Sequence, residues 1–220
     1  MLVLLFSLLA KMVIHRAQKK KIPLIVMPYV ERTPNTLNSA LISLEKTRGL
    51  MPVLLVGGTP GYITPWCTRF DCIEATPVPQ ALIEHAIRSD ERGDSKQFLR
   101  WRTTEAWDAL FALNAFLKTK REYLIWLQDD VEVIDLFNLP DHDLICLRVG
   151  NKYCGMVAYK MKRTVVERFV VKIKQQMHVK PIDWILDDVR QELMLTLHRF
   201  PKVLHKGEQS SNTKKRNVDV

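Results

Sequence analysis

Apolar and polar positions follow two different periods along the chain, and the change of period marks the expected elements. Short apolar runs rich in branched or aromatic side chains predict strands at residues 23–30, 52–56, 123–127, 144–149 and 153–160. Apolar positions at helical spacing predict helices at residues 37–46, 100–117, 164–177 and 181–195. Because a strand, a helix and a strand follow one another at the start of this series, we expect a parallel βαβ unit and an α/β fold.

The segments between these elements have the composition of loops. Residues 59–79 are rich in Pro, Gly and Thr, and residues 89–95 are polar and charged. The chain of 220 residues is 47% hydrophobic and 26% charged, which fits one globular domain with a full core. We therefore predict one domain at residues 23–211, preceded by a separate segment at 1–22 and followed by a disordered basic tail at 212–220.

The N-terminal segment, residues 1–22, is mostly apolar as far as Ile14 and basic after it. The apolar stretch is short for a membrane-spanning helix, which needs about 20 residues. Its basic residues follow the apolar stretch, which does not favour a cytoplasmic N-terminus. We interpret the segment as a short or truncated membrane anchor. An uncleaved signal sequence and an amphipathic helix on the membrane surface are the alternatives.

The net charge of +9 raises the question of a nucleic-acid partner. Much of the excess lies in two terminal clusters, residues 19–21 and 214–216. Such clusters are usually solvated arms, and here no aromatic residues are interleaved with them. We expect no nucleic-acid partner, while a general attraction to anionic membranes or polyanionic substrates stays open.

The cysteines allow two local disulfides. Cys67 could bridge to Cys72, and Cys146 to Cys154 if a turn brings them together. Both bridges would require an oxidising compartment. Buried free thiols are the equal alternative, because spacing alone does not determine pairing.

Two adjacent carboxylates directly after a buried strand carry the strongest chemical signal. Asp129 and Asp130 follow the apolar run 123–127, separated from it only by Gln128. Ligands of open α/β sheets bind at the carboxyl ends of such strands. Carboxylates there can hold a hard divalent cation, and the cation can neutralise a diphosphate. We predict Asp130 as the metal ligand, with Asp129 next. A solvated turn or a helix N-terminus is the alternative.

Four short segments carry further signals: Arg100–Thr103, Gln128–Asp130, Lys180–Asp187 and Leu204–Ser211. In the same order, they resemble the RWRT, EDD, KPIDWLLD and QHVGxHSS segments of the N-acetylglucosaminyltransferase IV family. The resemblance extends from Pro23 to Lys214. That family makes the β1,4 branch on the α1,3-mannose arm of N-glycans.

The resemblance implies a fold, a reaction and a location. The implied fold is the GT-A (nucleotide-diphospho-sugar transferase) fold, a Rossmann-like mixed sheet flanked by helices. The implied partners are a UDP-sugar donor, a glycan acceptor, and the divalent metal Mn²⁺ or Mg²⁺. The implied location is the Golgi or another secretory-pathway membrane, with the catalytic domain in the lumen.

The chain departs from the motifs of the family at a few positions. Gln128 stands where the family has Glu, and Gln209 where it has His. Thr104 and Glu105 replace a Lys-Gln pair after the RWRT segment. Gln128 keeps a group that can hydrogen-bond a ribose hydroxyl, but it lacks the charge of Glu.

The proposed reaction needs a base. Making a β-glycoside from an α-linked donor inverts the anomeric carbon, and a carboxylate must take the proton of the acceptor hydroxyl. We predict that Asp183, in the first turn of a helix, is this base. Asp187 lies one helical turn further and would hold the acceptor or act as the base instead. A helix-capping role for Asp183 is the alternative.

The remaining predicted site residues are basic. Arg100 and Arg102 could pair with a phosphate or stack on uracil, and the alternative is a solvated face beside a core Trp101. His205 lies after the last predicted helix, where the implied fold brings a final imidazole ligand to the metal, so the resemblance implies that it is a metal ligand. Imidazole suits Mn²⁺ better than Mg²⁺, and a surface histidine is the alternative. We expect structural roles for the histidines at 85, 142, 178 and 198.

Taken together, the residues and the family resemblance imply an inverting glycosyltransferase, and the resemblance implies that it moves N-acetylglucosamine from UDP-N-acetylglucosamine to a mannose of an N-glycan. One alternative is a related transferase that uses another UDP-sugar on a glycolipid or a different glycan. Another is a non-catalytic sugar-binding homologue.

Overall fold

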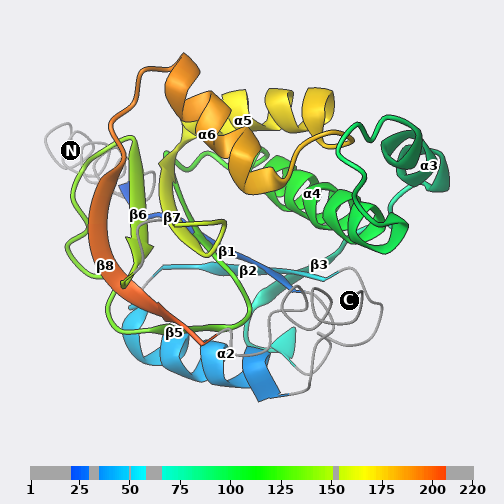
Figure 1. Cartoon of the computed structure of the whole chain (residues 1–220). Coiled ribbons are helices and arrows are strands. Elements are labelled where there is room, and N and C mark those ends of the chain that lie inside the picture. The colour runs from blue at the N-terminus through cyan, green and yellow to red at the C-terminus, as the bar shows by residue number, and fades with distance from the viewer. Residues whose placement is uncertain (1–20, 30–34, 50, 58–65, 151–153, 207–220) are drawn as a thin grey trace, which may run out of the picture.

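The computed structural model describes residues 21–29, 35–49, 51–57, 66–150 and 154–206. Within these ranges one eight-stranded sheet has helices on both faces (Figure 1), and its strand order is β3-β2-β1-β4-β7-β6-β8-β5. The elements in chain order are β1 (Leu24–Tyr29), α2 (Asn35–Thr47), β2 (Val53–Gly57), β3 (Asp71–Glu74), α3 (Gln80–Arg88), α4 (Lys96–Leu117), β4 (Tyr123–Leu127), β5 (Val131–Val133), β6 (Leu144–Arg148), β7 (Ala158–Lys162), α5 (Arg163–Gln176), α6 (Ile182–Glu192) and β8 (His198–His205).

The first half of the sheet is parallel, as the sequence predicted. Strand β1 pairs in parallel with both β2 and β4, and β2 pairs in parallel with β3. Every residue of β2 and β4 is buried. Helices cover both faces of these strands, which explains why they read as continuous apolar runs.

The second half of the sheet is mixed. Strand β7 is antiparallel to both β4 and β6, so β6 runs in the direction of β4. Strand β8 is parallel to β6, and it curves along the side of the sheet to pair antiparallel with β5 next to α2 (Figure 1). The carboxyl ends of β1, β2, β4, β6 and β8 therefore all lie at one edge, which we call the carboxyl edge.

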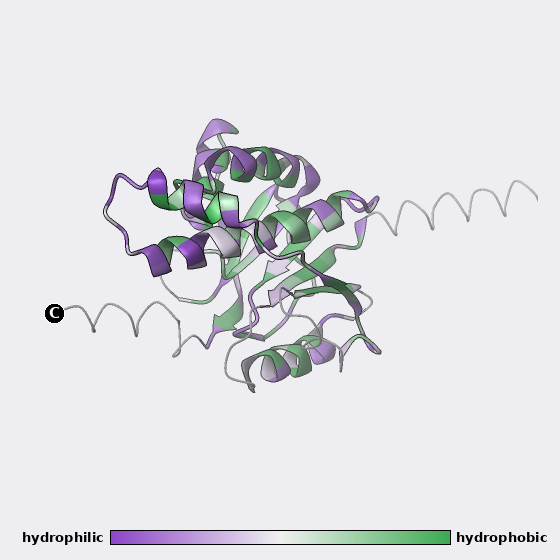
Figure 2. Ribbon diagram, turned by 90° about the vertical axis from the view of Figure 1, so that its right-hand side faces the viewer, coloured by the Kyte–Doolittle hydropathy of each residue, from purple (hydrophilic) through white to green (hydrophobic). Residues whose placement is uncertain are grey.

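The sheet separates two apolar cores. Helices α4, α5 and α6 cover one face and α2 covers the other (Figure 1). Successive side chains of β4 alternate between them, because Trp126 packs in the first core while Ile125 and Leu127 pack in the second. Figure 2 shows that the strands are mostly hydrophobic, whereas the helices carry both hydrophobic and hydrophilic residues. The predicted sheet flanked by helices is confirmed at this level.

Several elements differ from the sequence predictions. Strand β3 lies inside the predicted loop 59–79, while α3, β5 and β8 had not been predicted at all. Helix α4 begins at Lys96, because the Ser95 hydroxyl caps it by accepting a bond of 3.2 Å from the Phe98 backbone N–H. Strand β7 occupies Ala158–Lys162, a shift toward the C-terminus from the predicted 153–160.

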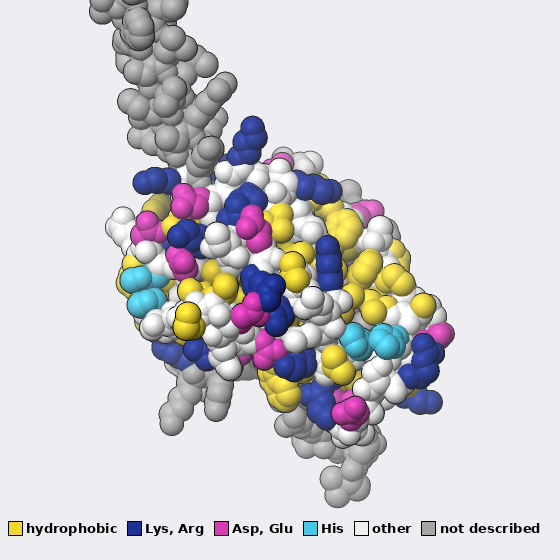
Figure 3. Space-filling model, turned by 90° about the horizontal axis from the view of Figure 1, so that it is seen from above, with side chains coloured by type: hydrophobic (Ala, Val, Ile, Leu, Met, Phe, Trp, Pro, Cys, Tyr) yellow, Lys and Arg dark blue, Asp and Glu magenta, His cyan; other side chains and the backbone are white. Residues whose placement is uncertain are grey.

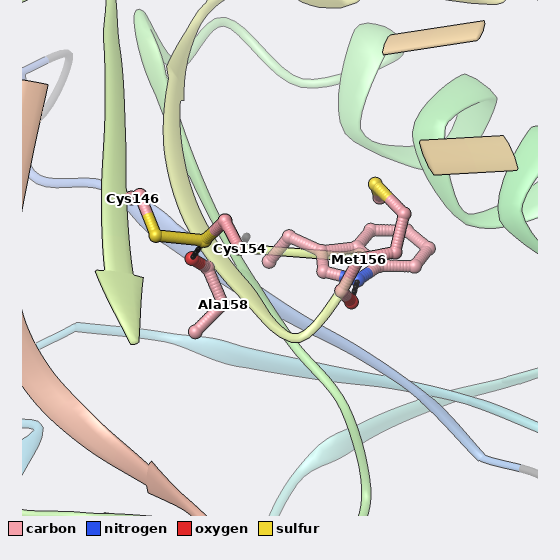
Figure 4. Close-up of a disulfide and its surroundings, with 5 residues drawn as sticks. Cys146, Cys154, Met156 and Ala158 are labelled. Atoms are coloured by element: carbon pink, nitrogen blue, oxygen red, sulfur yellow. Dashed lines mark hydrogen bonds between the residues drawn. A yellow bond between two sulfur atoms is a disulfide. The ribbon is translucent and has the colours of Figure 1, made fainter. Parts of the chain in front are cut away.

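All four cysteines are paired. Cys67 bonds to Cys72, and Cys146 of β6 bonds to Cys154, which lies before β7 (Figure 4). The free-thiol alternative is therefore wrong in this structure. The second bridge ties the middle of β6 to the segment that leads into β7. Disulfides persist in oxidising compartments, so this pairing agrees with a secretory location.

The predicted terminal segments fall largely outside the described residues. Of the anchor predicted at 1–22, only residues 21 and 22 are described, and the tail predicted at 212–220 is not described. Among the helices that the structure does describe, none has the length and apolar character needed to cross a membrane.

Candidate active site

The carboxyl edge places the predicted acid pair at the end of the central strand β4. The Gln128 backbone N–H continues the ladder by donating to the Val157 carbonyl at 2.9 Å. Asp129 and Asp130 then turn the chain toward β5, and they are only 2% and 4% exposed. Because a buried charge is costly without a compensating group, a solvated turn does not describe these carboxylates.

His205 lies directly beside Asp130. Strand β8 pairs His205 with Val131, and the next residue, Lys206, donates its backbone N–H to the Asp130 carbonyl at 2.9 Å. The His205 Nε2 atom lies 3.3 Å from Asp130 Oδ2. The fold thus brings together two predicted metal ligands that are far apart in the sequence.

Arg148 is a third charged group at this place, and the sequence analysis did not identify it. It ends β6, the parallel neighbour of β8, and its Nη2 atom lies 3.4 Å from His205 Nδ1. The only sequence signal was a single arginine at the end of an apolar run. A guanidinium here would lie next to any diphosphate bound through a cation at Asp130.

The chemistry of these groups fits a divalent cation such as Mn²⁺. Carboxylate oxygen and imidazole nitrogen are both ligands that Mn²⁺ accepts. Their separation of 3.3 Å is close to the roughly 3 Å expected between adjacent ligands of one ion. Within the described ranges no three of His, Cys, Asp and Glu gather into a metal site. The protein would supply few ligands, and substrate phosphate and water the others.

Asp183 lies in the first turn of α6 and is partly shielded from solvent. Burial raises the pKa of its carboxyl group, against the opposing effect of backbone hydrogen bonds. One of these bonds runs from the Trp184 backbone N–H to Asp183 Oδ1 at 3.1 Å. The N-cap residue of α6 is Pro181, so Asp183 does not occupy the capping position. A carboxylate with a raised pKa is a better proton acceptor.

Asp187 has a different environment one turn along α6. It is exposed and accepts hydrogen bonds from Arg190 Nε and Gln191 Nε2, both at 2.7 Å. The bond from Arg190 is the main reason why the pKa of this carboxyl lies below its usual value. Asp187 is therefore the weaker base of the two.

Tyr159 lies between α6 and the end of β4. It is a buried residue of β7 that pairs with Trp126 of β4, and Trp126 lies two positions before Gln128. Burial raises the pKa of the Tyr159 hydroxyl, and the negative charges of Asp183 and Asp187 raise it further. Helix α6 packs in the same apolar core as Tyr159, so both acids belong to a helix on that face of the sheet.

The two predicted arginines occupy very different environments. Arg102 is fully buried, and its guanidinium binds Asp94 Oδ2 at 3.3 Å and the His178 carbonyl at 3.1 Å. The bond to His178 ties α4 to the segment before α6, and the bond to Asp94 ties it to the loop before α4. The solvated-face alternative is therefore wrong for Arg102. Arg100 is exposed, and Trp101 is partly buried with its ring 5.7 Å from that of Phe98.

Asp108 is a further perturbed acid in the middle of α4. Its side chain is 7% exposed, and burial raises the pKa of its carboxyl to about 6. Asp108 follows the RWRT-like segment in the sequence, but nothing in the sequence pattern indicated that it would be buried.

Replacing Asp108 with Asn is expected to change how stability depends on pH. The raised pKa means that the folded state holds this proton more tightly than the unfolded state does. The wild type should therefore lose stability, relative to the variant, as the pH rises from 4 to 7. A shift of about two pKa units corresponds to roughly 3 kcal/mol at most. Urea unfolding of both proteins at several pH values measures the difference, and a constant difference would contradict the assignment.

Comparison with known proteins gives one consistent relationship. No family model matches the chain. A curated mouse protein, alpha-1,3-mannosyl-glycoprotein 4-beta-N-acetylglucosaminyltransferase B, is 24% identical over 185 residues, and its human counterpart is equally similar. The chain is thus distantly similar to two glycosyltransferases. The match covers 74% of this chain, and the chain spans about a third of the length of these relatives (33%).

Proposed function

We propose that the protein is a metal-dependent glycosyltransferase with a GT-A fold, and that the carboxyl edge is its donor site. The observation that carries the proposal is the buried pair Asp129–Asp130 at the end of β4 with His205 3.3 Å away. The distant similarity to glycosyltransferases supports the same reading. A mixed sheet with helices on both faces is compatible with this fold.

The donor we propose is a UDP-sugar, with UDP-N-acetylglucosamine as the first candidate. Asp130 and His205 would hold Mn²⁺ or Mg²⁺, which neutralises the charge of the leaving diphosphate when bound. Gln128 and Asp129 would contact the nucleoside. Arg148, next to His205, would add positive charge beside the phosphates. Arg100 is exposed and is therefore a candidate for binding the donor. Arg102 is buried, so it would affect the site indirectly, by holding the segment before α6 in place.

The base we propose is Asp183. Its carboxylate takes the proton of the acceptor hydroxyl as the hydroxyl oxygen bonds to the anomeric carbon, and the bond from that carbon to the diphosphate breaks on the opposite side. Partial burial keeps the pKa of Asp183 above its usual value, which strengthens it as an acceptor of protons. Asp187 would hold the acceptor by a hydrogen bond.

The acceptor we propose is a mannose of an N-glycan, linked through a β1,4 bond, in the lumen of the Golgi or another secretory compartment. The names of the two relatives and the two disulfides support this reading. A transferase for another UDP-sugar acting on a glycolipid or another glycan is the second candidate. A non-catalytic sugar-binding protein is less well supported, because binding alone does not need a base.

The described face formed by α4, α5 and α6 does not favour a nucleic-acid partner. On the face formed by α4, α5 and α6, basic and acidic side chains are interspersed (Figure 3). Several of them form ion pairs, such as Lys172 with Glu192 and Lys180 with Asp188. A polyanion would require a continuous basic surface.

Hydrolysis of a panel of sugar nucleotides, with and without Mn²⁺, tests the proposal. We expect slow release of UDP from UDP-N-acetylglucosamine that requires the metal, with less from UDP-glucose and none from GDP-mannose. Release that is equal for all donors, or absent with every donor and metal, would contradict the proposed function. The Asp130→Asn variant serves as the negative control.

A further inference from the structure

Trp184 is an exposed aromatic residue next to the proposed base. Its side chain is 53% exposed, although it follows Asp183 directly in the first turn of α6. Tryptophan is highly buried on average, so a half-exposed indole at this position needs an explanation. Its neighbours Ile182 and Ile185 are buried in the core, whereas Trp184 lies outside the core.

A tethered cation fixes the orientation of the Trp184 ring. The Arg92 guanidinium carbon lies 5.2 Å from the centre of the ring and covers one of its faces. Arg92 is itself held, because its Nη2 atom donates to the Val179 carbonyl at 2.8 Å and lies 3.4 Å from Asp94 Oδ2. Asp94 also binds the buried Arg102. The ring is thus contacted on one face by a cation that is itself anchored to Val179 and Asp94.

The Trp184 ring and the Asp183 carboxylate point in different directions. Neighbouring side chains on a helix are separated by about 100° and do not face each other. The Trp184 backbone N–H donates to Asp183 Oδ1 at 3.1 Å, so the two residues lie side by side at the start of α6. A ligand whose reacting hydroxyl lies at Asp183 would have to extend around the helix to contact the ring, so the ring would contact a different part of the ligand.

We propose that Trp184 is a stacking platform for an acceptor sugar residue next to the one that receives the transferred sugar. The proposal rests on the proposed function. A pyranose ring presents a patch of C–H groups whose partial positive charge matches the electron-rich face of an indole. Arg92 supports the ring from one side, and the exposed part remains open to the sugar. The acceptor would therefore be an oligosaccharide rather than a single sugar.

Steady-state kinetics of Trp184→Ala tests this proposal with two acceptors, a mannose-terminated oligosaccharide and methyl α-mannoside. We expect the KM for the oligosaccharide to rise at least about tenfold, because stacking and burial of an aromatic ring are both lost. The KM for methyl α-mannoside and the rate of donor hydrolysis should stay unchanged. Trp184→Phe should restore part of the loss, and Arg92→Ala should produce a smaller loss.

The readouts separate this proposal from the proposed function. If donor hydrolysis continues but Trp184→Ala changes the KM equally for both acceptors, or changes neither KM, then Trp184 is not a stacking platform. If the wild type hydrolyses no sugar nucleotide, the proposed function fails. Calorimetry then tests separately whether Trp184 contributes to binding of the same oligosaccharide. Binding by the wild type that Trp184→Ala loses would support it. Equal behaviour of the two proteins, including no binding by either, would overturn it.

Discussion

Replacing Asp183 with Asn is expected to lower the turnover number roughly 10²–10⁴-fold, because a positioned general base contributes about that factor. Asn keeps the size and the hydrogen bond from Trp184, so the change removes charge and basicity rather than packing. Affinity for the donor should stay within a few fold. Measuring the turnover number and donor binding separately checks the expectation.

The same variant has a predicted effect on stability and on pH dependence. Burial raises the pKa of Asp183 in the folded state, so its charged form costs stability as the pH rises through that pKa. Asp183→Asn should therefore be at least as stable as the wild type at neutral pH. The activity of the wild type should fall as the pH decreases through the same raised pKa.

Asp187→Asn is the matched control for this prediction. Asp187 shares the helix face but is held by Arg190 and Gln191, so the loss of its charge should affect turnover much less. A normal turnover number for Asp183→Asn together with an inactive Asp187→Asn would move the base to Asp187. If both variants stay fully active, neither acid is the base.

Asp130→Asn is expected to abolish Mn²⁺-dependent binding of the donor, with a loss of affinity of at least about 100-fold, because the metal contributes several kcal/mol. The side chain is 4% exposed, and Asn preserves its shape while removing the charge that faces His205. Calorimetric titration of UDP with and without Mn²⁺ measures this loss.

Glu132→Gln is the control for the metal site. Glu132 lies two residues further on, in β5, but it is exposed and pairs with Lys206 at 2.6 Å. Its removal should leave metal-dependent binding intact. Donor affinity in Asp130→Asn that equals the wild-type value, with and without metal, would contradict the assignment of Asp130.

The central strands could be predicted because burial on both faces leaves a continuous apolar signal. Strands β2 and β4 show this pattern at every position. Strand β8 could not be predicted, since most of its side chains are only partly buried and Pro201 interrupts it. Strands β3 and β5 are too short to carry a period, with four and three residues.

The site was predictable to the extent that it follows strands or resembles a family motif. Asp130 stands at the end of a predicted strand, and the resemblance pointed to His205. Arg148 was missed because its place in the site depends on β8, which brings His205 next to it from 57 positions away. The burial of Arg102 was also hidden, since arginine is mostly exposed and the His178 carbonyl that binds it lies 76 positions away.

The most direct test of the central claim is the structure of the product made from UDP-N-acetylglucosamine and a mannose-terminated N-glycan in the presence of Mn²⁺. Proton NMR of that product reports the configuration of the new glycosidic bond. The account predicts a β-linked N-acetylglucosamine, formed with release of UDP, only with the metal, and lost in Asp183→Asn. An α-linked product, or a β-linked product formed equally well by Asp183→Asn or without metal, would contradict it.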